Sequence, residues 1–280
     1  MTAEPGPPEV QTRVVRAAGT DINVSVRGTG QPLLLIMGLG GNIGMWEPLQ
    51  RWLVPHGFQT ISFDAPGTGD SPRLRRPRRM TALATMVQQI LQAIGQDQVD
   101  VLGVSLGGAI AQQLAHQAPT RVRKLILAAT MPGLGGVPGS PAVLLRMTTR
   151  RRYRDPEYFN QVAGRLYGGR ARQGERTPEY TPPAAMSPPR VASPPGLAGY
   201  LHQLYAIQGW TSMPWLHQLP HDTLVMAGDD DPIVPLVNAR LLTWRIPKAE
   251  LHIVRGGGHL FLVEEPGPCA AVIAEFLHRR

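Results

Sequence analysis

The chain has 280 residues, of which 42% are hydrophobic, and a formal net charge of +8. This composition is typical of a globular protein rather than a disordered one. Because no apolar run approaches the roughly 18 residues that a membrane span needs, we expect no such span. The positive charge comes almost entirely from arginine and no basic motif is interleaved with aromatic residues, so a nucleic-acid partner is not predicted. A single cysteine, Cys269, excludes an internal disulfide and favours a cytoplasmic location.

The first half of the chain predicts strands that alternate with helices. Residues 1–12 are polar and proline-rich, with no basic segment leading into an apolar one, so we expect a disordered tail and no signal peptide. A hairpin follows, turning at Gly19, and after it come short continuous apolar runs typical of strands buried on both faces: 32–38, 59–64, 99–103 and 124–130. An apolar stripe over 81–94 predicts a helix. This alternation indicates βαβ units and a mostly parallel sheet flanked by helices.

The pattern changes after Thr130. Residues 131–220 show no clear strand, which predicts a mostly helical insertion of about ninety residues, far longer than an ordinary connection. Within it, residues 177–196 are so dense in proline that they favour a loop over helix or strand. Strand patterns resume at 223 and over 249–254, and a closing helix follows. We therefore expect one α/β core, residues 13–130 and 221–280, interrupted by the insertion 131–220.

The segment Gly103-Val104-Ser105-Leu106-Gly107 matches the G-x-S-x-G pattern of a nucleophile elbow, between a predicted strand and a predicted helix. In that motif the serine takes a strained backbone conformation, and the glycines let neighbouring backbone pass without a Cβ clash. The helix that follows directs N–H groups and its positive end at a developing oxyanion. The alternative is a serine that only caps a helix; the strand and helix around it favour a nucleophile, Ser105.

A serine nucleophile needs a base, and the base needs a carboxylate that orients it. In chain order the acid is expected before the histidine, and three aspartates follow the strand that starts at 223. We expect Asp231, directly before Pro232, to be this acid, with Asp230 as the second choice. His259 lies in a glycine run just beyond the last strand, where a loop can bring its imidazole over the sheet edge. We expect His259 to be the general base.

Two backbone N–H groups are expected to bind the oxyanion. Leu106 follows the nucleophile and supplies one, and Leu39, after Gly38 in the loop "MGLGGN", supplies the other. That loop lacks the G-x-x-x-x-G-K-[ST] pattern, so it is not expected to bind a nucleotide phosphate. Asp64 and Asp70 suggest a carboxylate pair for a metal, but no histidine lies near them in the sequence to complete a ligand set. We therefore expect neither a metal nor a cofactor.

With these residues in place, the chain resembles an α/β-hydrolase. The segments "LLLIMGLGGN", "GVSLGGAIAQQLAH", "GWTSMPWLHQL" and "RLLTWRIP" make it similar to the intracellular poly(3-hydroxyalkanoate) depolymerases of the medium-chain-length type, from about residue 20 to the C-terminus. The resemblance implies a cofactor-free triad of Ser105, Asp231 and His259 that hydrolyses stored polyester and short model esters. It also implies that the insertion caps the active site and forms the acyl-binding surface. The proline-rich 177–196 stretch departs from the family pattern, which leaves open the acyl length and the choice between polymer and small ester.

The insertion is rich in methionine and aromatic side chains, which favour an apolar cleft for a hydrophobic substrate. Together with Gly38, we expect Trp210 and Trp215 to contact the substrate. The arginines of 146–176 suggest either contact with the surface of a polyester granule or simply a solvated face. A small soluble ester, a lactone or an activated C–C bond is the alternative substrate. A non-catalytic binding protein on the same fold is disfavoured, because such proteins usually lose a triad residue.

Overall fold

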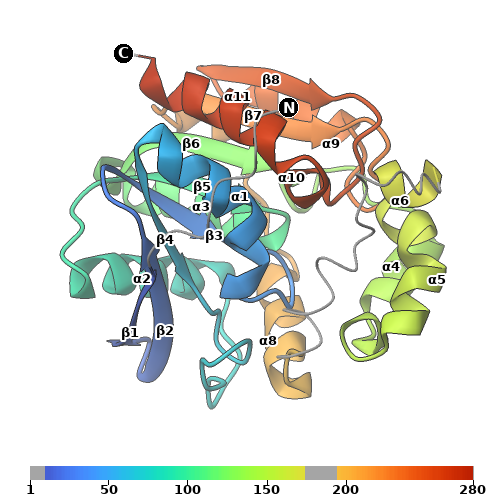
Figure 1. Cartoon of the computed structure of the whole chain (residues 1–280), viewed down its shortest axis with the longest axis horizontal. Helices are drawn as coiled ribbons and strands as arrows, with labels where there is room; N and C mark the ends of the chain where they lie inside the picture. Colours follow the sequence, from blue (N-terminus) through green and yellow to red (C-terminus); the bar gives the residue numbers. More distant parts are fainter. Residues whose placement is uncertain (1–9, 174–193, 280) are drawn as a thin grey trace.

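A computed structural model describes residues 10–173 and 194–279. Its centre is an eight-stranded sheet in the order β1-β2-β4-β3-β5-β6-β7-β8 (Figure 1). The strands are β1 (Val10–Ala17), β2 (Thr20–Arg27), β3 (Gln31–Ile36), β4 (Phe58–Phe63), β5 (Val99–Val104), β6 (Val122–Ala128), β7 (Thr223–Gly228) and β8 (Ala249–Val254). β2 pairs antiparallel with β1 and with β4, and every other pairing is parallel. The expected α/β architecture is confirmed.

Helices cover both faces of this sheet. The helices outside the β6–β7 connection are α1 (Glu47–Leu53), α2 (Met80–Ala93), α3 (Leu106–Gln117), α9 (Val237–Arg245), α10 (Phe261–Glu264) and α11 (Pro266–His278). Along β3, Leu33 and Leu35 pack with α1 and α11, whereas Leu34 and Ile36 pack with α2 and α3. All four side chains are buried. Burial on both faces is why these strands are continuous apolar runs rather than alternating ones.

The connection between β6 and β7 is helical in its described part, as its sequence predicted. It contains α4 (Pro141–Met147), α5 (Pro156–Tyr167), α6 (Gly169–Gln173) and α8 (Leu197–Ile207), with a short 3₁₀ turn, η4 (Arg151–Tyr153). In Figure 1, α4, α5 and α6 lie together beside the sheet, and α8 stands apart from them. Phe159 and Leu166 of α5 join a buried apolar cluster with Met45 and Ile233 of the core. The helices therefore pack on the end of the sheet rather than standing free.

The expected tail 1–12 is wrong in its last three residues, because β1 begins at Val10. Val10 pairs with Arg27, so the hairpin extends to the full length of β2 and its ladder orders these residues. Residues 1–9 of the expected tail and 177–193 of the expected proline-rich loop lie outside the described residues. Residues 194–196 of that loop are neither helix nor strand and lead directly into α8.

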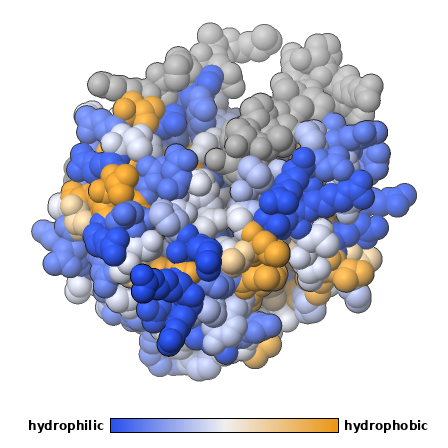
Figure 2. All heavy atoms as spheres, turned by 90° about the horizontal axis from the view of Figure 1, so that it is seen from below, coloured by the Kyte–Doolittle hydropathy of each residue, from blue (hydrophilic) through white to orange (hydrophobic). Residues whose placement is uncertain are grey.

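The outer surface is mostly hydrophilic on the face shown in Figure 2, where apolar side chains occur in small groups separated by polar ones. Within the described ranges, no helix is long and apolar enough to cross a membrane.

Candidate active site

Ser105 lies at a strained turn between β5 and α3. Its backbone has φ 56° and ψ −119°, and its N–H donates to the carbonyl of Ala128 at 2.9 Å. The neighbouring glycines are required by space: a Cβ on Gly107 would lie 2.0 Å from the carbonyl oxygen of Ile36, and one on Gly103 would lie 2.4 Å from that of Gly107. A positive φ at a non-glycine residue is uncommon, costs free energy and occurs often at functional sites. The conformation is the one that the G-x-S-x-G motif requires.

His259 and Asp231 are joined by a hydrogen bond. Nδ1 of His259 lies 2.7 Å from Oδ2 of Asp231, and both residues are 6% exposed. The other carboxylate oxygen, Oδ1, accepts the N–H groups of Ile233 and Val234, each at 2.9 Å. The N–H of His259 donates to the carbonyl of Tyr167 at 2.7 Å. The carboxylate is thus fixed at both oxygens, and it orients the imidazole.

The other two aspartates of this turn bind elsewhere. Asp230, the second choice for the acid, accepts the N–H of Gly169 at 2.9 Å and pairs with Arg172. Asp229 accepts a backbone N–H from the turn after β8 at 2.6 Å. Both therefore hold loops together, and the histidine is hydrogen-bonded to Asp231.

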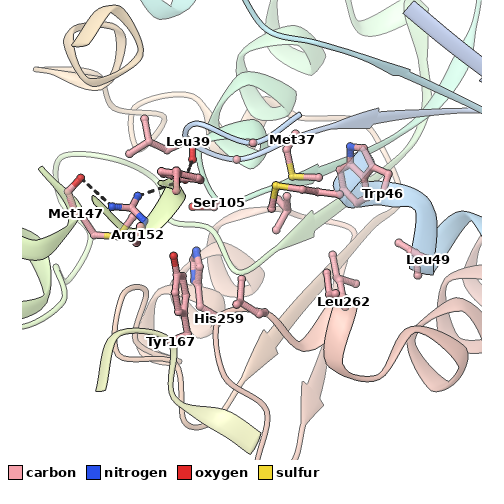
Figure 3. A pocket seen from close by; sticks show the side chains of 17 residues that line it. Met37, Leu39, Trp46, Leu49, Ser105, Met147, Arg152, Tyr167, His259 and Leu262 are labelled. Atoms are coloured by element: carbon pink, nitrogen blue, oxygen red, sulfur yellow. Dashed lines mark hydrogen bonds between the residues drawn. The ribbon is translucent and has the colours of Figure 1, made fainter. Parts of the chain in front are cut away.

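Ser105 and His259 line the same cavity, which we call the inner cavity (Figure 3). Its wall beyond them is mainly apolar and includes Met37, Met45, Trp46, Leu49 and Leu262. In Figure 3, Trp46 and Leu49 lie on one side of Ser105, and Met147 and Arg152 on the other. A second cavity, lined by side chains such as Leu144, Leu204 and Ile233, shares Leu39, Ser105 and Met147 with the first. Ser105 therefore lines two mainly apolar cavities.

The two expected oxyanion donors lie beside the serine. In the described part of the chain, neither the N–H of Leu39 nor that of Leu106 donates a hydrogen bond to another residue. Gly38 lines the inner cavity, and a Cβ at that position would be 3.1 Å from Cβ of Ser105. The hydroxyl of Tyr153 donates to the carbonyl of Leu39, which fixes the loop from the other side. Two free N–H groups next to a nucleophile are the arrangement that binds an oxyanion.

Asp64, which follows β4, connects several loops through hydrogen bonds. Its buried carboxylate accepts the Nδ2 group of Asn23 at 2.9 Å, the N–H of Ile43 at 2.8 Å and the N–H of Asp70 at 3.0 Å. Among the residues that the structure describes, no group of three histidine, cysteine or acidic side chains could hold a metal ion. The carboxylate of Asp64 is thus occupied by N–H donors.

A family model described as "alpha/beta hydrolase fold" matches residues 31–266. The chain belongs to the α/β-hydrolase fold family. A poly(3-hydroxyalkanoate) depolymerase from Ectopseudomonas oleovorans is 45% identical over 248 residues, which cover 89% of this chain and 84% of that protein. A 2-hydroxymuconate semialdehyde hydrolase from Pseudomonas sp. strain CF600 is 30% identical, over 99% of this chain and 97% of that protein. The enol-lactonase from Burkholderia xenovorans LB400 has the same fold, with a TM-score of 0.80 at 20% identity over 95% of this chain and 100% of that one.

In this α/β hydrolase, Trp210 and Trp215 lie outside both cavities that contain Ser105. The indole Nε1 of Trp210 donates to Gln113 of α3 at 2.7 Å, and its ring packs in the sheet core. Trp215 stacks on His116 of α3 at 4.3 Å between ring centroids. The expectation that they contact the substrate is corrected here: the chain returns from the insertion onto the outside of α3 at this point, and the two rings cover that helix.

Sequence reasoning missed several residues of the site. Met37, Trp46 and Leu49 line the inner cavity, although they belong to the core half of the chain. Arg152 also lines it and is 2% exposed, whereas the arginine-rich segment was expected to face solvent or a granule. The run of arginines around it has no apolar periodicity that would have shown which one turns inward.

One acid close to the site has a shifted pKa. Burial raises the pKa of Glu264 to about 7, against the opposing effect of Arg170. Glu264 ends α10, shortly after His259 in the chain, and a Cβ on Gly169 would be 3.0 Å from its Oε2. The carboxyl group therefore lies between α10 and α6.

Proposed function

We propose that this chain is a serine hydrolase that cleaves carboxylic ester bonds through Ser105, His259 and Asp231. The observation that carries the proposal is the strained Ser105 facing the same cavity as His259, whose Nδ1 is held by the buried carboxylate of Asp231. A nucleophile, a base and an orienting acid on this fold, in this chain order, are typical of acyl transfer.

The mechanism has two steps. His259 takes the proton of the Ser105 hydroxyl as its Oγ attacks the ester carbonyl, and the N–H groups of Leu39 and Leu106 bind the oxyanion. The C–O bond to the alcohol then breaks, and His259 gives its proton to the departing oxygen. Water, activated by the same histidine, attacks the acyl-enzyme, releases the carboxylic acid and restores the serine. Asp231 holds the imidazole in place and stabilises the imidazolium.

The proposed substrate is an aliphatic polyester of 3-hydroxyacyl units, or its oligomers. Support comes from the 45% identity to a poly(3-hydroxyalkanoate) depolymerase and from the two apolar cavities that meet at Ser105. We propose that residues 131–220 cap these cavities. Exposed apolar side chains of this segment support contact with a polyester granule in the cytoplasm: Leu134, Val137, Leu144, Leu145, Leu197 and Leu201.

A small soluble ester or lactone is the second candidate substrate. It is favoured by the inner cavity itself, whose wall contains both Ser105 and His259. A short acyl group in this cavity would need no polymer chain in the second one.

The test compares two substrates and two proteins. Clearing of a poly(3-hydroxyoctanoate) suspension and hydrolysis of p-nitrophenyl octanoate are measured for the parent protein and for Ser105→Ala. We expect the parent to act on both, and the variant to lose on the order of 10⁶-fold in kcat with its fold intact by circular dichroism. A fluorophosphonate should add its mass to the parent alone. Hydrolysis of the small ester without clearing would favour the second candidate, and activity retained by Ser105→Ala would refute the triad.

A further inference from the structure

Arg152 is a charged side chain buried in the wall of the inner cavity. It belongs to η4, is 2% exposed, and lies beside Met147 near Ser105 (Figure 3). Its neighbour Arg151 differs: that side chain is 63% exposed and pairs with Asp155 at 3.0 Å. A guanidinium stays protonated even when buried, so burial of Arg152 brings a full positive charge to the cavity.

Within the described ranges, Arg152 donates hydrogen bonds only to neutral oxygen atoms, and its guanidinium also lies 4.6 Å from the centroid of the Tyr153 ring and 5.7 Å from that of Tyr200. Nη1 donates to the carbonyl of Thr149 at 2.8 Å and more weakly to those of Arg146 and Met147. Nη2 donates to the hydroxyl of Tyr200 at 2.8 Å and lies 3.4 Å from that of Tyr153. Within the described residues, the buried Nε–H has no hydrogen-bond partner.

Among the residues that the structure describes, no carboxylate pairs with this guanidinium. Burial raises the pKa of Tyr200 to about 12, so this phenol is neutral at physiological pH and donates its own proton to the carbonyl of Met147. A buried charge without an opposite charge is costly, and such a group in a cleft is a candidate for binding an anionic ligand. A carboxylate is the anion that a guanidinium binds most readily, and the Nε–H of Arg152 is the donor left for it.

We propose that Arg152 binds the free carboxylate end of the substrate, so that the ester cleaved is the one next to that end. This inference rests on the proposed ester hydrolysis. In a 3-hydroxyacyl oligomer, the last ester oxygen and the terminal carboxylate are separated by only two carbon atoms. A carboxylate held by Arg152 therefore places this ester in the same cavity as Ser105.

The reaction under this proposal is removal of one unit. The Oγ of Ser105 bonds to the acyl carbon, the ester C–O bond breaks, and His259 protonates the departing hydroxyl. The leaving group is a 3-hydroxy acid whose carboxylate is still on Arg152, and water then frees the shortened chain, which ends in a new carboxylate. Each turnover regenerates the group that Arg152 recognises, which favours stepwise release of monomers.

The test uses a matched pair of substrates, the linear dimer of 3-hydroxyoctanoate as its free acid and as its methyl ester. Both contain the same internal ester, whose cleavage is followed by release of its alcohol product, 3-hydroxyoctanoate or methyl 3-hydroxyoctanoate. The ratio of the two kcat/KM values cancels general damage to the protein. We expect the parent to prefer the free acid by about 10-fold to 100-fold, the range of a charge-assisted hydrogen bond. The preference should fall below about 3-fold in Arg152→Gln and persist in part in Arg152→Lys. The matched control is Arg151→Gln, which should keep the parent's ratio.

A binding measurement separates this proposal from the function on which it rests. In the Ser105→Ala background, calorimetry compares 3-hydroxyoctanoate with its methyl ester, with and without Arg152→Gln. Tighter binding of the acid by at least 10-fold, lost with Arg152→Gln, supports the site even if no ester is hydrolysed. Equal binding of acid and methyl ester by the Ser105→Ala protein overturns the proposal. This outcome does not depend on whether Arg152→Gln folds. Ester hydrolysis with the same acid-to-methyl-ester ratio in the parent and Arg152→Gln overturns it as well, and leaves the proposed hydrolase intact.

Discussion

Asp231→Asn tests the proposed triad, because the contacts of Asp231 determine how the asparagine amide would be oriented. Its Oδ1 accepts two N–H groups, those of Ile233 and Val234. An asparagine at this position keeps its carbonyl oxygen there, because its NH₂ group cannot accept either N–H. The NH₂ group then takes the place of Oδ2, 2.7 Å from Nδ1 of His259. Nδ1 becomes an acceptor, and the proton of the neutral imidazole moves to Nε2.

That tautomer cannot act as a base toward Ser105, because its Nε2 already carries a proton. The variant also loses the negative charge that stabilises the imidazolium in the transition state. Loss of the base costs roughly 10² to 10⁴ in rate, and the combined effect of such a substitution is about 10⁴-fold in kcat, or about 5 kcal/mol. Hydrolysis of p-nitrophenyl octanoate measures it, with KM expected to change little.

Asp230→Asn is the matched control, one residue away in the same turn. Its carboxylate holds Gly169 and Arg172 rather than the histidine, and the ion pair is partly exposed. We expect a loss of at most about 3-fold in kcat and less than about 1 kcal/mol in stability. A loss below 10-fold in Asp231→Asn, or equal losses in the two variants, would refute the assignment of the acid.

Two further predictions concern stability. Burial raises the pKa of Glu264 from 4.5 to about 7. Between these two pH values the folded protein keeps the proton that the unfolded chain has released. The free energy of unfolding therefore falls as the pH rises from 4.5 to 7. Urea unfolding should therefore show Glu264→Gln to be more stable than the parent by up to about 3 kcal/mol at pH 8 and nearly equal to it at pH 4.5. A difference in stability that does not change with pH contradicts the burial argument. Trp210→Phe removes the hydrogen bond to Gln113 and should cost about 1 to 3 kcal/mol. The KM for p-nitrophenyl octanoate should not change, and a rise above about 5-fold would return this indole to the substrate site.

The fold could be predicted from the sequence because its core strands are buried on both faces. The run of Leu33 to Ile36 has no alternation, which only a covered parallel strand tolerates, and β8 (Ala249–Val254) lies where its pattern placed it. The start of β1 was missed because Val10 is ordered by pairing with Arg27, a contact between strands that local composition does not contain. The same limit applies to Trp210, whose place in the insertion suggested the site but whose ring packs on α3.

The candidate site was predictable where a motif specifies backbone geometry. The glycines around Ser105 are required by contacts as close as 2.0 Å, so the pattern itself implies the turn. Asp230 and Asp231 are adjacent in an irregular turn, and the sequence does not contain the contacts that distinguish them: Asp231 is hydrogen-bonded to His259, whereas Asp230 binds Gly169 and Arg172. Arg152 could not have been chosen from its neighbours, since a 3₁₀ turn of three residues has no face that a sequence pattern reveals.

The insertion is hydrogen-bonded at two points to the loop that contains Leu39 and Gly40. Tyr153 of η4 donates to the carbonyl of Leu39, and the side chain of Gln203 on α8 accepts the N–H of Gly40 at 2.8 Å. Gly40 has φ 71°, and a Cβ there would lie 2.9 Å from the ring of Tyr153, so the loop and the insertion are in direct contact. Two separate elements of the insertion thus hold two consecutive residues of the loop that we propose supplies an oxyanion donor. A movement of η4 or α8 away from this loop would break one of these hydrogen bonds, so we expect the positions of the N–H groups of Leu39 and Gly40 to depend on the position of the insertion.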